Sequence, residues 1–150
     1  MNNRKSSTQP ELASALAAEL RTTFRKIKLR LREHAGHGDL TPSQISVILR
    51  LEKDGPATVS NLARTEGMRP QSMSAVVTPL LESGLVRGVP DPSDGRQTLM
   101  SLMPKCLKLL EEGRAARQDW LTARISQKLS VQEQEKLQAA LALLTRLVED

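Results

Sequence analysis

The sequence has almost none of the large aromatic residues: among 150 residues there is one phenylalanine, Phe24, one tryptophan, Trp120, and no tyrosine. A buried core must therefore consist of aliphatic side chains and methionine, which suits packed helices. The single cysteine, Cys106, excludes an internal disulfide framework. No apolar run approaches the roughly 18 residues needed to span a bilayer, and the first ten residues, MNNRKSSTQP, lack the apolar core of a secretion signal. We therefore expect a cytoplasmic protein with no membrane partner.

Acidic residues are outnumbered by basic ones, 17 against 22, which gives a formal net charge of +5 and a pI of about 9.8. This excess favours an anionic partner such as nucleic acid. Part of the excess forms a stripe at helical spacing, Arg21, Arg25, Lys28 and Arg32. The stripe would contact DNA phosphates or an acidic partner, or remain a solvated surface.

Apolar residues three and four positions apart predict a long first helix over residues 10–35, after a disordered tail over 1–9. They are Ala13, Leu16, Leu20, Phe24, Ile27 and Leu31. Such a narrow stripe is typical of a helix that packs against another helix. A second helix begins at Thr41, since Pro42 and Gln44 complete a capping box. Its expected buried face is Ile45, Ile48, Leu49 and Leu51.

Two further helices, separated by a few residues around Gly67, predict a helix-turn-helix. The first is capped by Thr58, and the second follows Arg69 and ends near Ser83. The second helix has an apolar face that should pack on the core: Met73, Val76, Val77, Leu80 and Leu81. Its opposite face carries short or flat side chains: Gln71, Ser72, Ala75 and Thr78, with Ser74 at the border. These side chains would reach base edges in the major groove, and Arg69 a phosphate or a guanine; the alternative is a plain solvated face.

A hairpin is predicted after the helix-turn-helix, with strands over 85–89 and 97–102. A helix-turn-helix followed by a two-stranded hairpin is a winged helix. The tip of the hairpin contains Asp91, Asp94 and Arg96. Arginine suits the narrow, electronegative minor groove, and a neighbouring carboxylate can hold its guanidinium in place beforehand. We therefore assign Arg96 to DNA and Asp91 and Asp94 to orienting it or the tip; the alternative is that the tip holds only ordinary turn residues.

Two apolar-striped helices, over residues 104–128 and 130–149, complete the chain, the latter opened by a capping box of Ser130 and Glu133. Together with the first helix, they have little to bury against within a small winged domain. A second copy of the chain would cover them, and a two-fold dimer would place two recognition helices about 34–36 Å apart on a palindrome. The alternative is that these helices pack only on their own lobe.

Residues 41–105 resemble the DNA-binding lobe of the MarR family of bacterial transcription regulators. The resemblance lies in Val59-Ser-Asn-Leu-Ala63, Leu80-Leu-Glu-Ser-Gly-Leu-Val86 and Asp91-Pro-Ser-Asp-Gly-Arg96. The family's wing reads Asp-x-Arg-Asp-x-Arg, and here Ser93 replaces the first arginine. Other departures are Arg69 in place of a capping serine or threonine, Ala75 in place of a longer basic residue, and Pro79 inside the recognition helix, where we expect a kink with Pro79 on the outer side.

The resemblance implies a mainly α (α+β) fold in a single chain over residues 10–150. A winged helix-turn-helix lobe would cover 41–103, and helices 10–35 and 104–149 would form a dimerisation lobe. It implies a homodimeric repressor of a palindromic operator, released by a small molecule that binds between the lobes. Phe24 and His34 are candidates for lining that ligand pocket.

Other functions have weaker support in the sequence. No glycine-rich phosphate loop, paired-cysteine motif or nucleophile motif indicates an enzyme. His34, His37 and Asp39 lie in one loop, but two histidines there are a weak metal signal, so we predict no metal and no cofactor. A winged helix used only for protein contact is the main alternative. A redox-sensing regulator acting through Cys106 is another, although Cys106 also fits the role of a small buried apolar residue.

Overall fold

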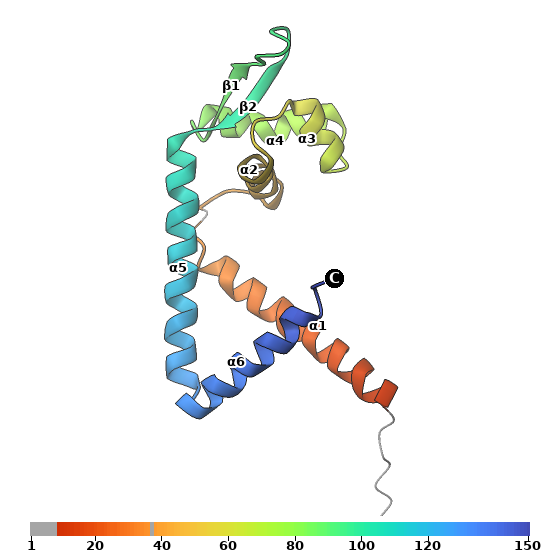
Figure 1. The fold of residues 1–150 in the computed structure, drawn as a ribbon. Coiled ribbons are helices and arrows are strands. Elements are labelled where there is room, and N and C mark those ends of the chain that lie inside the picture. Colours follow the sequence, from red (N-terminus) through yellow and green to blue (C-terminus); the bar gives the residue numbers. More distant parts are fainter. Residues whose placement is uncertain (1–8, 37) are drawn as a thin grey trace, which may run out of the picture. The chain divides into compact units, whose positions relative to one another are not determined.

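A computed structural model describes residues 9–36 and 38–150 (Figure 1). Six helices and two strands follow in the order α1 (Gln9–Glu33), α2 (Pro42–Asp54), α3 (Val59–Thr65), α4 (Pro70–Glu82), β1 (Val86–Pro90), β2 (Thr98–Leu102), α5 (Pro104–Lys128) and α6 (Val131–Arg146). The mainly helical prediction with one hairpin is therefore confirmed. Gln9, which we assigned to the tail, belongs to α1, and the rest of the predicted tail lies outside the described residues.

The chain forms two compact units. Unit 2 is continuous, from Gly36 to Arg114, and unit 1 combines the chain up to Ala35 with the chain from Ala115 onward. Unit 2 therefore contains α2, α3, α4, the hairpin and the first part of α5. Unit 1 contains α1, the rest of α5 and α6. The boundary between the units falls inside α5.

The hydrophobic core lies in unit 2 and consists of aliphatic and sulfur-containing side chains, as the lack of aromatic residues requires. Its buried members are Val47, Ile48, Leu51, Leu62, Ala63, Met73, Val77, Leu80, Leu85, Val86, Met100, Cys106 and Leu110. Every element of unit 2 contributes at least one of them. The core therefore fixes α3, α4 and the hairpin against one another, and these are the elements predicted to contact DNA.

Local hydrogen bonds begin the helices where the sequence predicts. The backbone N–H of Gln44 donates to Thr41 Oγ1 at 3.2 Å, and the Thr41 N–H donates to the Gln44 side chain at 2.9 Å. Thr58 accepts from the Asn61 N–H in the same way, at 3.1 Å. Ser130 and Glu133 form the second predicted capping box. Each cap satisfies backbone donors that have no partner within the helix.

Two predicted core residues are exposed instead. Leu49 on α2 is 43% exposed and Leu81 on α4 is 40% exposed, so both predictions were wrong. On α2 the buried positions are Gln44, Val47, Ile48 and Leu51, and on α4 they are Met73, Val77 and Leu80. The buried positions lie on one narrow face of each helix. Consecutive residues of a helix are rotated by about 100°, so Leu49 and Leu81 lie outside that face. Val47, only 1% exposed, takes the place that we gave to Leu49.

Unit 1 buries far less within the described chain. Neither α1 nor α6 has a buried residue. His34, which follows α1, stacks on Trp120 of α5 with ring centroids 4.8 Å apart and planes 17° from parallel. Several large apolar side chains of this unit are exposed: Leu12, Leu16, Phe24, Ile27, Leu29, Val131, Leu141, Leu143, Leu147 and Val148. No helix within residues 9–36 and 38–150 combines the length and hydrophobicity needed to cross a bilayer.

Cys106 lies in the core of unit 2 with 0% of its surface exposed. Burial raises the pKa of its thiol above the ordinary value, and the charge of Glu52 raises it further. Glu52 is paired with Arg114 across α2 and α5, and the bond from Arg114 lowers the pKa of Glu52. Since the thiolate is the reactive form of cysteine, these surroundings disfavour a redox sensor at Cys106.

We expect the thiol of native Cys106 to remain unlabelled by a disulfide reagent at neutral pH and to react once denaturant unfolds the chain. Because the folded chain holds the thiol proton more tightly than the unfolded chain, this residue contributes stability below a pH of about 8.5. That contribution is lost as the pH rises from there towards the folded pKa. The free energy of unfolding of the native protein and of Cys106→Ala, measured between neutral and alkaline pH, gives this contribution. Fast stoichiometric labelling of the native protein would restore the redox interpretation.

Candidate nucleic-acid interface

The turn between α3 and α4 is formed by backbone geometry that the sequence indicates. Gly67 has a φ of 65°, in the left-handed region that favours glycine. The N–H of Met68 then donates to the Ala63 carbonyl at 2.8 Å. Leu62 and Ala63 of α3 are buried. The two helices are thus joined by four residues and held by the core, which is the arrangement of a helix-turn-helix.

Glu66 connects this turn to α2 through hydrogen bonds, a role that no pattern in the sequence indicates. Ser46 donates to one carboxylate oxygen of Glu66 at 2.9 Å, and Arg50 Nε donates to the other at 3.3 Å. The Glu66 side chain is only 17% exposed, so these bonds are partly shielded from water. The connection spans 16 to 20 residues of sequence, which is why no local pattern predicts it.

The two faces of α4 differ as their chemistry requires. Met73, Val77 and Leu80 are buried. The candidate base-reading residues all lie exposed: Gln71, Ser72, Ser74, Ala75 and Thr78. Arg69 is exposed at the N-cap and makes no side-chain capping bond. The helix therefore exposes small and polar side chains, while its large apolar side chains remain in the core.

Pro79 lies on the exposed side of α4, as expected, and the helix continues past it to Glu82. Proline has no N–H, so the bond that residue 79 would donate to the preceding turn is missing. One residue earlier, the Thr78 hydroxyl donates to the Ser74 carbonyl at 2.8 Å. This bond fixes the Thr78 side chain against its own helix.

The hairpin pairs β1 with β2 in antiparallel register, from Val86 opposite Leu102 to Pro90 opposite Thr98 (Figure 1). Ala57, just before α3, forms a bridge to Met100, with the Met100 N–H donating to the Ala57 carbonyl at 2.7 Å. A β-carbon at Gly88 would lie 2.8 Å from Cγ2 of Thr98, which is too close. Glycine at this position therefore allows the two strands to pack with Thr98 in its present place.

The hairpin tip holds Arg96 beside a carboxylate. Asp94 Oδ1 accepts from the Arg96 N–H at 3.1 Å and from Arg96 Nε at 3.3 Å. Asp91 Oδ1 accepts from the Ser93 N–H at 2.8 Å and so shapes the turn backbone. The Arg96 side chain nevertheless remains 93% exposed. The tip thus presents an arginine that is partly oriented before any partner arrives.

Two further candidate residues belong to the other unit of the chain. Phe24 is 65% exposed on α1, and His34 is stacked on Trp120; both belong to unit 1. Within residues 9–36 and 38–150 no three or more His, Cys, Asp or Glu residues gather as a metal site would need. His37 of the weak metal candidate lies outside the described residues.

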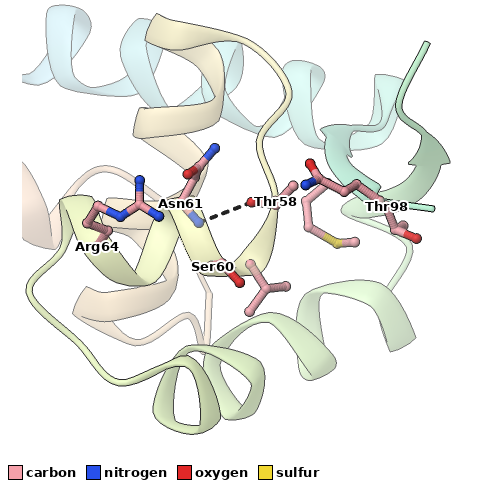
Figure 2. A pocket seen from close by; sticks show the side chains of 8 residues that line it. Thr58, Ser60, Asn61, Arg64 and Thr98 are labelled. Atoms are coloured by element: carbon pink, nitrogen blue, oxygen red, sulfur yellow. Dashed lines mark hydrogen bonds between the residues drawn. The ribbon is translucent and has the colours of Figure 1, made fainter. Parts of the chain in front are cut away.

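A polar pocket of about 440 Å³ lies between α3 and β2 (Figure 2). Its lining is Thr58, Val59, Ser60, Asn61, Arg64, Gln97, Thr98 and Met100. Figure 2 shows Arg64 and Asn61 on the α3 side of the pocket and Thr98 on the opposite side. No local pattern in the sequence predicts this pocket, because its two lining segments lie more than 30 residues apart. Only the position of Gln97, next to Arg96, could have pointed to it.

Comparison with curated proteins shows relatives along most of the chain. An uncharacterised HTH-type transcriptional regulator of Mycobacterium bovis is 33% identical over 90% of this chain and 94% of its own length. The HTH-type transcriptional repressor MdtR of Bacillus subtilis is 27% identical over 87% of this chain and 82% of its own length. Both relatives therefore match far more of the chain than the winged helix alone.

Solved structures agree with these relatives. A protein of Pseudomonas aeruginosa named as a transcriptional regulator has a TM-score of 0.77 and 33% identity, over 95% of this chain and 99% of its own. A mutant of the Staphylococcus aureus protein MepR, bound to an oligodeoxyribonucleotide, shares the fold, with a TM-score of 0.70, 18% identity and coverage of 89% and 98%. The profile of the MarR family matches residues 40–98. The chain therefore belongs to the MarR family of transcriptional regulators, which are winged-helix DNA-binding proteins and not enzymes.

Proposed function

We propose that this chain is a homodimeric, sequence-specific repressor that binds a palindromic operator and is released by a small molecule. The observation that carries the proposal is the surface of unit 2. One exposed face of small and polar side chains on α4 and one exposed, partly oriented arginine at the wing tip belong to the same compact unit. A helix in the major groove and an arginine in the adjacent minor groove read DNA in two ways at once.

In this proposal each residue has a role that follows from its chemistry. Gln71 reads a base edge through its amide, Ser72 and Ser74 donate to bases or phosphates, and the methyl groups of Ala75 and Thr78 meet thymine methyls. Arg69 contacts a phosphate or a guanine. Arg96 enters the minor groove, with Asp94 orienting its guanidinium and Asp91 shaping the tip.

The exposed apolar residues of unit 1 support a homodimer. A single chain leaves Leu16, Phe24 and Ile27 of α1 between 44% and 65% exposed. Leu141 and Leu143 of α6 are 51% and 60% exposed. Apolar surface of this extent is typical of a protein interface. A second copy of the same helices buries it with two-fold symmetry, which matches a palindromic site.

Repression and release by a ligand rest on relatives and on the family. The relative MdtR is named a repressor, and the family resemblance implies a small-molecule effector, with Phe24 and His34 as candidate lining residues of its pocket. Such an effector acts by preferring a dimer whose half-site spacing does not fit DNA. DNA as the target places the protein in the bacterial cytoplasm.

Selection of bound sequences from random duplex DNA tests this function directly. We expect an enriched palindrome with half-sites one helical turn apart, about 10 base pairs from centre to centre. Light scattering on the same preparation is expected to give the mass of two chains. A monomer indifferent to every duplex at low ionic strength would contradict the proposal and favour a winged helix used for protein contact alone.

A further inference from the structure

We infer that the pocket between α3 and β2 holds a backbone phosphate of the DNA. This inference rests on the proposed function, because it concerns the DNA strand that separates the groove read by α4 from the groove entered by Arg96. The site would take a phosphate diester oxyanion, and it would add Ser60, Asn61, Arg64, Gln97 and Thr98 to the residues that contact DNA.

The charge of the pocket points to an anion. Among the described residues that line it, Arg64 is the only charged one, and none is Asp or Glu. Within the part of the chain that the structure describes, no acidic side chain lies within ion-pair distance of Arg64. An arginine in a polar hollow without a carboxylate partner has its full charge available for an outside anion.

The neutral side chains around Arg64 supply further donors. Within residues 9–36 and 38–150, the side-chain polar groups of Ser60, Asn61, Gln97 and Thr98 make no hydrogen bond inside the chain. Two hydroxyls and two amides therefore line, together with one guanidinium, a volume of about 440 Å³. Hydroxyl, amide and guanidinium groups are the donors that proteins direct at DNA phosphates.

The position of the pocket decides which anion we assign to it. Major and minor grooves are separated by a single sugar-phosphate strand, so a protein that enters both must straddle that strand. Gln97 directly follows Arg96 and leads into β2, while Arg64 lies on the helix that the turn joins to α4. The pocket is thus bounded by the elements that adjoin the two groove-reading parts. A phosphate held here would fix the register of α4 and of the wing together.

The close packing of the hairpin determines one wall of this pocket. Gly88 leaves room for the Thr98 methyl group, which a β-carbon at position 88 would displace. Thr98 lines the pocket, so the shape of the phosphate site depends on a glycine on the neighbouring strand. This dependence ties the geometry of the wing to the contact made by α3.

Arg64→Gln tests the assignment, with Arg64→Lys and Lys108→Gln as companions. Lys108 lies on α5 of the same unit, does not line the pocket, and its replacement removes the same charge. Affinity for the selected duplex and for a scrambled duplex is measured by fluorescence anisotropy between about 50 and 200 mM salt. We expect Arg64→Gln to weaken both by the same factor, about three- to tenfold, and to make the salt slope shallower by about 0.9.

The two companion variants distinguish an effect of the Arg64 charge from an effect on the structure. Arg64→Lys should keep the wild-type salt slope because it keeps the charge, and Lys108→Gln should keep both slope and affinity. An unchanged slope in Arg64→Gln, or a loss confined to the selected sequence, would overturn the phosphate assignment. If the wild-type protein binds no duplex at all, the proposed function fails before this inference is reached.

Calorimetric titration of the DNA-free protein with inorganic phosphate, at constant ionic strength, distinguishes a free oxyanion from the DNA backbone. We expect no saturable binding of inorganic phosphate in the millimolar range. The pocket is open and would contact a single phosphate, so its occupancy depends on the other contacts between the protein and the DNA. Tight phosphate binding that Arg64→Gln abolishes, together with unchanged DNA affinity in that variant, would assign the pocket to a free anion instead.

Discussion

Leu80→Ala is expected to lower the free energy of unfolding by about 2–5 kcal/mol, the range for a leucine removed from a packed core. Leu80 is 0% exposed and packs at the centre of unit 2. Its loss leaves a cavity beneath α4, on the side opposite to the candidate base-reading residues. Denaturant titration followed by far-ultraviolet circular dichroism measures the effect.

Leu81→Ala is the matched control, since it removes the same side chain one position further along the same helix. Leu81 is 40% exposed, so we expect it to cost less than half as much as Leu80→Ala. Equal costs would mean that something in the folded protein covers Leu81, and that the burial of α4 differs from the one described.

Arg96→Ala is expected to weaken binding to the selected operator by about tenfold to a hundredfold, which corresponds to about 1–3 kcal/mol for a specific arginine contact. The fold should persist, because the Arg96 side chain is 93% exposed and, among the described residues, bonds only to Asp94. Affinity measured by anisotropy, with circular dichroism as the check of folding, gives the result. We also expect reduced preference for A·T pairs beneath the wing.

Arg87→Ala provides the control within the same hairpin, since Arg87 is exposed on β1 away from the tip. Asp94→Ala should lie between it and Arg96→Ala, because it leaves the arginine present but no longer oriented. If Arg87→Ala weakened binding as much as Arg96→Ala, the effect would reflect general charge and not the tip. Undiminished affinity in Arg96→Ala would refute the wing assignment.

Features that depend on neighbouring residues were predictable from the sequence. The caps at Thr41, Thr58 and Ser130 and the left-handed Gly67 each follow from one side chain and the backbone within four residues. The bond that Asp94 accepts from the Arg96 N–H spans two residues and belongs to the same class. These signals sufficed to order the elements and to recognise a winged helix.

Features that depend on the tertiary surroundings were not predictable. The edge of a buried helical face is set by what packs against it, so Leu49 and Leu81 were placed wrongly although the faces were nearly right. Glu66 and the pocket between α3 and β2 join segments 16 or more residues apart through ordinary polar side chains. No spacing rule within a sequence distinguishes such residues from a solvated surface.

The distribution of the aromatic rings has a practical consequence for spectroscopy. Trp120 and Phe24 both belong to unit 1, and the sequence of unit 2 contains no phenylalanine, tryptophan or tyrosine. Intrinsic fluorescence therefore reports on a single indole, whose neighbour is the imidazole of His34, and gives no direct signal from the winged helix. A change within unit 1 and the binding of DNA can thus be followed by separate probes in one sample, with indole emission for the first and a dye on the duplex for the second.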